Sequence, residues 1–185
     1  MKLLLAIVGI AVLLGLFAVV YRNGLIARDE AVKAGWSQID TQLQRRADLI
    51  PNLVNTVKGY ATHEKEIFER IADARGRLLS AQGPAAKAEA SGELNNCIGR
   101  LLAVAENYPN LKASDNFRGL QDELAGTENR IAVARTRYND DVRDFNAAIR
   151  GFPGSLFAPG LGLKLAEYFQ PPEAKKLQDP PKVQF

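Results

Sequence analysis

The residues of this chain that could support binding chemistry gather around one proline. Arg45, Arg46 and Asp48 lie shortly before Pro51, and Asn52 follows it directly. Guanidinium, carboxylate and amide groups beside a disturbed helix could line a polar pocket for a ligand or a partner. The same groups could instead form a buried ion-pair network that fixes how helices pack. We favour the network, because polar residues on a buried helix seam commonly set the packing register.

Four further charged residues belong to the same predicted cluster. Glu64 lies on the same apolar stripe as Arg46, and the others lie on a later helix that we expect to pack against that stripe. A buried charge is costly unless an opposite charge meets it, so Arg46 needs a carboxylate partner. The complete candidate cluster is Arg45, Arg46, Asp48, Asn52, Glu64, Glu128, Arg130 and Arg135.

Side chains for acid–base, nucleophilic or metal chemistry are scarce. His63 is the only histidine and Cys97 the only cysteine, so a closed metal site lacks ligands and an intrachain disulfide is impossible. Cys97 has uncharged neighbours, which favours a structural thiol over a nucleophile. Ser37 and Thr127 have no identifiable base. We therefore predict no catalytic residue, no metal, no cofactor and no enzymatic activity.

The charge pattern argues against one class of partner. The net charge is +3, the pI is near 9.0, and basic and acidic residues interleave without a polybasic block. A nucleic-acid surface would need clustered Lys and Arg, usually with aromatic stacking groups. We predict no nucleic-acid partner.

Long helices would position the polar cluster. From Val32 to Ala81, apolar residues recur in alternating steps of four and three, and Arg46 and Glu64 are the two charged exceptions on that stripe. This repeat predicts a helix of fifty residues, about 75 Å long, with one buried seam. Such a stripe needs other helices to cover it.

Pro51 lies inside this predicted helix. A proline removes a backbone hydrogen bond, so either the helix bends here or a new helix begins. We favour a bend, because the seam keeps its register across Pro51. The side chains of Asp48 and Asn52 could supply hydrogen-bonding groups to the disturbed backbone.

Two more helices are expected, over residues 85–108 and 115–150, each with its own apolar seam. Tight turns between them predict an all-α, antiparallel, left-handed bundle of three long helices, or four if the first is divided. After residue 152 the chain is aromatic and proline-rich, where we expect a short helix around residues 161–169 and then an extended tail.

The first apolar run suits a membrane. Residues 3–21 are uncharged and would span about 28 Å as a helix, close to the ~30 Å hydrocarbon thickness of a bilayer. A cleaved signal peptide is the alternative, but the run exceeds the usual apolar length and lacks a small-x-small cleavage site. The predicted division is a transmembrane anchor over residues 1–22, a helical bundle over 23–152 and an aromatic, proline-rich extension over 153–185.

The orientation of the anchor depends on few charges. Lys2 and the α-amino group lie on one side of the run, and Arg22, Arg28 and Lys33 lie on the other. The excess of basic residues after the run favours a cytoplasmic bundle. Because the excess is small, an anchor with the bundle outside the cytoplasm remains the alternative.

Several strings spread along the chain carry one resemblance. They are WSQID at 36–40, QL at 42–43, RRxDLIPNLV at 45–54, TVKGY at 56–60, ENYPxLK at 106–112, TENRI at 127–131, RYN at 137–139, Val142, FP at 152–153 and PxVxF at 181–185. Together they resemble the LemA family, and the match covers nearly the whole chain, including the anchor. The resemblance implies a bacterial single-pass inner-membrane protein with an all-helical soluble domain, and it brings no established reaction. A magnetosome membrane-biogenesis protein of this family hints at membrane organisation in one lineage.

The residues of this chain are compatible with three functions. The favoured one is a membrane-anchored helical scaffold or adaptor of the bacterial envelope that acts by protein–protein contact or self-association, without catalysis. Its predicted partners are the lipid bilayer, through residues 3–21, and a second copy or an envelope protein. The alternative is a regulatory or small-ligand-binding domain that uses the polar cluster around Arg46, Asp48 and Pro51. An enzyme is disfavoured, because acid–base candidates are so few.

Overall fold

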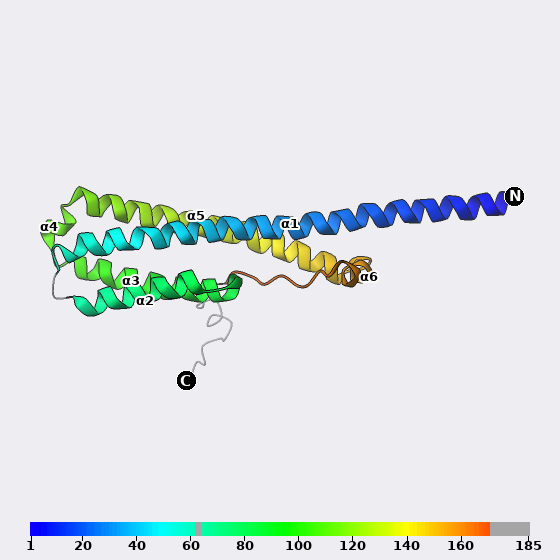
Figure 1. The fold of residues 1–185 in the computed structure, drawn as a ribbon. Helices are drawn as coiled ribbons and strands as arrows, with labels where there is room; N and C mark the ends of the chain where they lie inside the picture. The colour runs from blue at the N-terminus through cyan, green and yellow to red at the C-terminus, as the bar shows by residue number, and fades with distance from the viewer. Residues whose placement is uncertain (62–63, 171–185) are drawn as a thin grey trace, which may run out of the picture. The chain divides into compact units, whose positions relative to one another are not determined.

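The computed structural model describes residues 1–61 and 64–170, and within that part of the chain the regular structure is entirely helical (Figure 1). This confirms the predicted all-α fold. The elements, in chain order, are α1 (Lys2–Lys58), α2 (Lys65–Ser80), α3 (Gly83–Ala105), α4 (Pro109–Lys112), α5 (Asp115–Arg150), α6 (Gly154–Phe157) and the 3₁₀ turn η1 (Pro159–Leu161).

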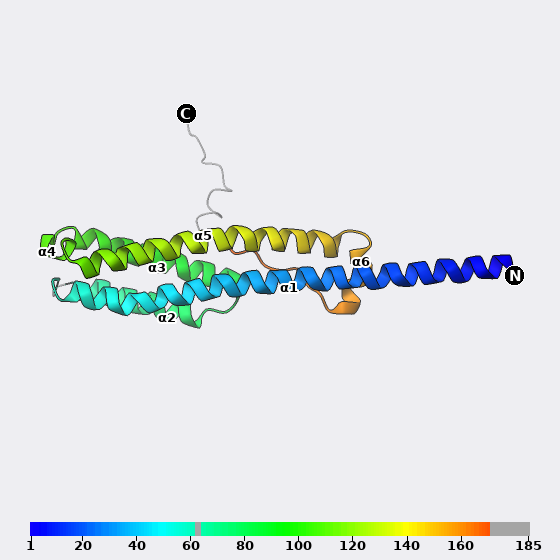
Figure 2. The same cartoon turned by 90° about the horizontal axis from the view of Figure 1, so that it is seen from above.

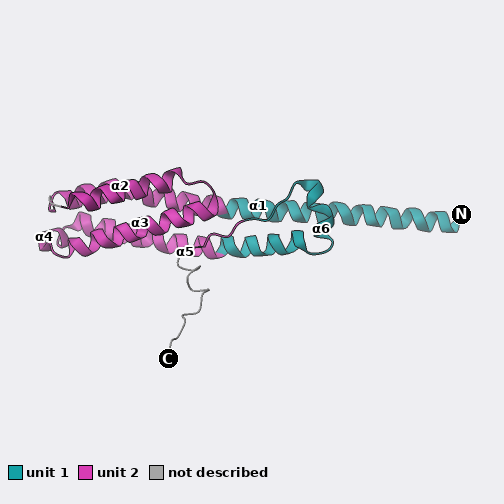
Figure 3. Cartoon of the chain, turned by 90° about the horizontal axis from the view of Figure 1, so that it is seen from below, with its two compact units in different colours: residues 1–35, 137–166 teal, residues 36–136, 167–185 magenta. Residues whose placement is uncertain are grey.

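The chain forms two compact units (Figure 3). Unit 1 contains residues 1–35 and 137–166, and unit 2 contains residues 36–136 with the described residues from 167 onward. Both α1 and α5 contribute to each unit. The domain boundaries that the sequence predicts, at residues 22 and 152, remain predictions.

Unit 2 is a bundle of four helical segments. Its members are the last part of α1, all of α2 and α3, and the first part of α5 (Figure 2). Each segment turns one apolar stripe inward, as a helix with apolar residues three and four apart must. The fully buried side chains of this core include Ile39, Leu43, Ile50, Leu53, Ile71, Leu78, Leu94, Leu101 and Phe117.

The prediction of one continuous helix over residues 32–81 is wrong, because two helices occupy this range. α1 ends at Lys58 and α2 begins at Lys65, so the break begins at Gly59 and not at Pro51. Tyr60, expected on the seam, is 45% exposed, whereas Ala61 is buried. Glycine costs about 1 kcal/mol in a helix interior. The α2 part of the stripe packs against α3, and Phe68, Ile71, Ala74 and Leu78 are buried there. His63 lies outside the described residues.

The later elements agree better with expectation. α5 has the predicted bounds of 115–150, and α3 lies within three residues of the predicted 85–108 at each end. The predicted short helix over residues 161–169 is wrong: α6 and η1 come earlier, and residues 163–170 are not helical. Gly162 has a left-handed φ of 67°, which ends the 3₁₀ turn and is easy only for glycine.

Unit 1 pairs the first part of α1 with the end of α5. Leu25 and Val142 are fully buried in this unit, and Gly35 lies against α5, where an added Cβ would be 3.4 Å from the ring of Tyr138. The amide of Asn146 binds the backbone of Ala166 at both N–H and C=O, each at 2.9 Å. These two bonds supply backbone partners to the segment where a helix was expected.

α1 is the one described helix that is long and apolar enough to cross a membrane, and its first part is the apolar window. The large apolar side chains from Leu3 to Val20 are all exposed in unit 1, as a lipid-facing helix requires. Asn23 and Gly24 do not interrupt the helix.

Candidate functional site

One ion pair lies at the centre of the predicted cluster. A terminal guanidinium nitrogen of Arg46, on α1, donates to the carboxylate of Glu128, on α5. Arg46 is only 6% exposed, and burial lowers the pKa of its guanidinium to about 10. The Glu128 side chain is 51% exposed, so water solvates its other side. The pair therefore joins a buried cation, still protonated at neutral pH, to a half-solvated anion.

The same carboxylate also contacts α3, a connection that the sequence did not indicate. The amide Nδ2 of Asn95 donates to Glu128 over 3.4 Å. Three buried polar atoms around this position have no hydrogen-bond partner within the described part of the chain: Arg46 Nε, Asn95 Oδ1 and, one turn earlier on α1, Gln42 Oε1. Buried polar groups normally have partners. One donor and two acceptors match what a water molecule or a small polar ligand offers.

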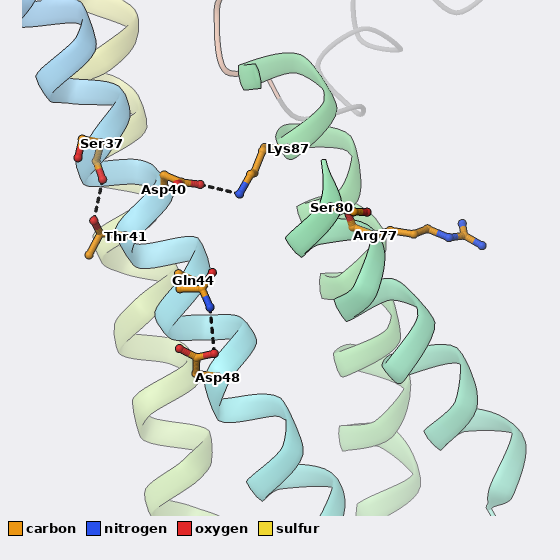
Figure 4. Close-up of polar contacts among 8 residues, drawn as sticks. All are labelled: Ser37, Asp40, Thr41, Gln44, Asp48, Arg77, Ser80 and Lys87. Atoms are coloured by element: carbon orange, nitrogen blue, oxygen red, sulfur yellow. Dashed lines mark hydrogen bonds and ion pairs between the residues drawn. The ribbon is translucent and has the colours of Figure 1, made fainter. Parts of the chain in front are cut away.

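The charged neighbours of Arg46 lie at the surface. Arg45 pairs with Glu123 of α5 at 2.8 Å, both side chains being about half exposed. Asp48 accepts a hydrogen bond from Gln44 at 3.1 Å (Figure 4) and lies 3.8 Å from Arg75 of α2. Exposed pairs of this kind contribute ~1 kcal/mol or less. They add little stability, but they connect α1 to α2 and α5.

The carbonyl oxygen that Pro51 leaves without its helical partner is that of Ala47. The Nε–H of Arg75 donates to this oxygen at 2.7 Å. The partner therefore comes from α2, and not from the Asp48 or Asn52 side chains, which could have supplied hydrogen-bonding groups to the disturbed backbone. This contact explains how α1 continues through Pro51 to Lys58.

A second inter-helix ion pair lies nearer the start of unit 2. Lys87 of α3 donates to Asp40 of α1 at 2.6 Å, with the lysine side chain largely buried (Figure 4). Figure 4 also shows Thr41 bonded back to the carbonyl of Ser37, at 2.8 Å. The hydroxyl of Thr127 is likewise bonded to its own helix, at the carbonyl of Leu124. Local bonds of this type occupy hydroxyls that sequence alone left without a role.

The other predicted residues lie apart from Arg46. Asn52 is exposed and lines a shallow cavity of about 370 Å³ with Asn55, Thr56, Asn116 and Leu120. Glu64 is half-buried at the start of α2. Arg130 is exposed and Arg135 half-buried on α5, and among the described residues neither forms an ion pair with the cluster carboxylates Asp48, Glu64 or Glu128.

A second groove, of about 400 Å³, lies between α2 and α3. It is lined by Arg70, Arg77 and Arg100, together with Glu93 and Cys97. Arg77 donates to both carboxylate oxygens of Glu93, at 2.8 and 3.0 Å. Burial and the nearby Glu93 raise the pKa of the Cys97 thiol, so the thiol stays protonated at neutral pH. The groove carries charge, but its thiol is not activated.

Comparison with known proteins identifies the family. The LemA family matches residues 35–185. The magnetosome protein MamQ of Magnetospirillum gryphiswaldense is 30% identical over 174 residues, covering 80% of this chain, and MamQ 2 of Paramagnetospirillum magneticum matches equally well. The protein LemA of Metamycoplasma hominis is 25% identical over 168 residues, covering 89% of this chain and 77% of that protein.

The chain spans 64% of the length of the MamQ relatives. The family match nevertheless covers well over half of this chain, from residue 35 onward, and includes all four helical segments of unit 2. The chain belongs to the LemA family.

Proposed function

We propose that this protein is a single-pass, membrane-anchored helical scaffold that acts by binding other proteins or a second copy of itself. The observation that carries the proposal is the continuity of α1. The apolar run and the first helix of unit 2 are one helix from Lys2 to Lys58, without a linker between them. An anchor built this way would hold the helical bundle at the membrane.

The use of charge in unit 2 supports a structural role. Arg46 with Glu128, Lys87 with Asp40, and Arg77 with Glu93 each join two different helices of the bundle. Groups committed to such pairs hold helices in register and are poorly placed for acid–base work.

The proposed location is a bacterial inner membrane with the bundle in the cytoplasm. Arg22, Arg28 and Lys33 follow the span, whereas Lys2 precedes it. Only basic residues enter this rule, so the ion pair of Lys33 with Asp29 does not weaken it. Protease added to intact spheroplasts should spare the bundle, and digestion of the bundle there would reverse the orientation.

Site-specific crosslinking in cells tests the scaffold function. A photoreactive phenylalanine analogue at the exposed positions Tyr60 or Val133 should yield crosslinks to a second copy or to an envelope protein. The same analogue at Phe17, inside the apolar run, serves as a control for contacts made only through the anchor. Light scattering on the detergent-solubilised chain should show a species larger than one copy. A monomer without crosslinks at either site would contradict the proposal.

A second candidate function is small-ligand binding at the polar cluster. The specific observation in its favour is the set of partnerless buried atoms on Gln42, Arg46 and Asn95. A ligand that fills this set should raise the unfolding temperature of the wild type but not of an Asn95→Leu variant. A panel of small polar metabolites that shifts neither protein would remove this candidate.

A further inference from the structure

The short helix α6 is docked at one place on α1, inside unit 1. The ring centroid of Phe157 lies 5.7 Å from that of Tyr21, and Tyr21 in turn stacks on Phe17 at 5.9 Å. Gly154 is buried, and a Cβ there would overlap the carbonyl oxygen of Ala148 and lie 3.0 Å from the Tyr21 hydroxyl. Since Tyr21 is the last residue of the uncharged run, α6 lies where the apolar helix would leave a bilayer.

Docking accounts for Phe157 but not for its apolar neighbours. Phe152 is 89% exposed and Leu156 is 72% exposed. Single exposed apolar residues are ordinary on soluble proteins. Here two large ones lie on a segment held against a candidate span, whose own residues Phe17 and Val20 are also exposed. The apolar surface of the span thus continues onto the segment that contains α6.

The charge of this segment has one sign. Between residues 145 and 166 there is no Asp or Glu, and the two charged residues, Arg150 and Lys164, are both exposed and basic. Arg22 adds a third basic residue directly after Tyr21. Basic residues beside apolar side chains are typical of segments that lie in the headgroup layer of an anionic membrane. A second copy of this face would bring the same positive charges and be repelled.

We propose that residues 150–164 form a second membrane contact, in which Phe152 and Leu156 enter the interfacial layer of an anionic bilayer while Arg150 and Lys164 meet its headgroups. This contact rests on the proposed anchor at residues 3–21. It would fix the depth of α1 in the membrane by a site distant in sequence from the span.

Fluorescence quenching by brominated lipids tests the contact on the full chain. Trp36 is the only tryptophan, so a Trp36→Phe background allows single probes to be placed at will. The test probe is Phe152→Trp, and Leu13→Trp inside the span is the positive control. Val133→Trp is the negative control, because Val133 is exposed on α5 about 25 Å of helix before Arg150. All are reconstituted in vesicles of brominated phosphatidylglycerol and phosphatidylcholine.

We expect quenching and a blue shift for the probes at positions 152 and 13, and neither for the probe at 133. Quenching at 13 without quenching at 152 would overturn the second contact and leave the anchor intact. Loss of quenching at both positions would overturn the anchor, and the second contact with it. A blue shift at 152 that grows with protein concentration without quenching would assign the face to a second copy.

Two further measurements provide a second probe of the same face and test the role of its basic residues. Leu156→Cys in a Cys97→Ala background, labelled with an environment-sensitive fluorophore, gives an independent probe of the same face and should brighten in the vesicles. An Arg150→Gln, Lys164→Gln double variant of the position-152 probe should lose the stronger quenching expected in phosphatidylglycerol over pure phosphatidylcholine. Equal quenching in both lipids before that change would contradict the anionic preference.

Discussion

The Nε–H of Arg75 donates a 2.7 Å hydrogen bond to the carbonyl oxygen of Ala47, the residue four before Pro51. In a regular helix that oxygen would accept from the N–H of residue 51, which proline lacks. A side chain from α2 thus replaces the one backbone bond that proline removes from α1. The replacement ties α2 to α1 at the position where α1 would otherwise be weakest.

Removing this side chain should destabilise unit 2. Arg75→Met keeps most of the apolar stem but leaves the oxygen of Ala47 without its donor, which should lower the free energy of unfolding by about 1–3 kcal/mol. Urea denaturation followed by circular dichroism measures the loss. Arg70→Met, at an exposed site on the same helix, is the matched control and should change stability by less than about 0.5 kcal/mol.

A double-mutant cycle makes the same prediction sharper. Pro51→Ala restores the missing N–H, so Arg75→Met should cost clearly less in that background than in the wild type. Equal costs in both backgrounds would show that Arg75 does not compensate for the proline.

The Arg46–Glu128 pair should respond unequally to loss of its two members. Arg46→Met removes a buried charge and its partnerless Nε, and Glu128 remains half solvated, so stability should stay within about 1 kcal/mol of the wild type or rise. Glu128→Ala leaves the buried guanidinium without its anion and should cost about 1–3 kcal/mol. Denaturant titrations of both variants measure which one is less stable. A larger loss of stability in Arg46→Met than in Glu128→Ala would contradict the assignment of Arg46 as the buried member and Glu128 as the half-solvated member of the pair.

The reactivity of Cys97 should report its raised pKa. The thiolate is the form that attacks iodoacetamide and displaces iodide, so alkylation at neutral pH should be slower than for an unperturbed thiol and should increase only at higher pH. Because the pKa is raised in the folded state, the contribution of this thiol to stability is constant below its unfolded pKa and falls as pH rises through the folded one. Glu93→Gln removes a raising charge and should move the rate–pH profile to lower pH. An unmoved profile would exclude Glu93 as a cause.

Two glycines of the same segment offer a matched comparison. Gly154→Ala should undock α6, because the new methyl group meets the backbone of Ala148 and the hydroxyl of Tyr21. Gly160→Ala meets nothing within 4 Å and should be tolerated. Hydrogen exchange at the Ala158 amide, which bonds to the carbonyl of Gly154, should accelerate in the first variant only. Similar exchange in both variants would place the docking contact elsewhere.

Periodicity alone determined much of this fold. The apolar steps in residues 115–150 predicted the bounds of α5, and those after Val32 predicted the buried face of α1 as far as Val57. They also placed Arg46 on that face, from which a carboxylate partner such as Glu128 could be expected. The buried stripe of a helix repeats with every turn, so the spacing of apolar residues in the sequence is enough to predict it.

Tertiary structure decided where the helices turn and what meets the polar groups. The stripe keeps its phase across both Pro51 and Gly59, so periodicity could not say which of them ends α1. Arg75 bonds to the carbonyl oxygen of Ala47, which Pro51 leaves without a donor, from 28 positions along the chain, and Asn95 reaches Glu128 from 33 positions away. Such contacts depend on how neighbouring helices are set side by side, which one-dimensional spacing does not contain. The contacts of the polar cluster therefore depend on how the helices pack, whereas the apolar seam around it could be predicted from the sequence.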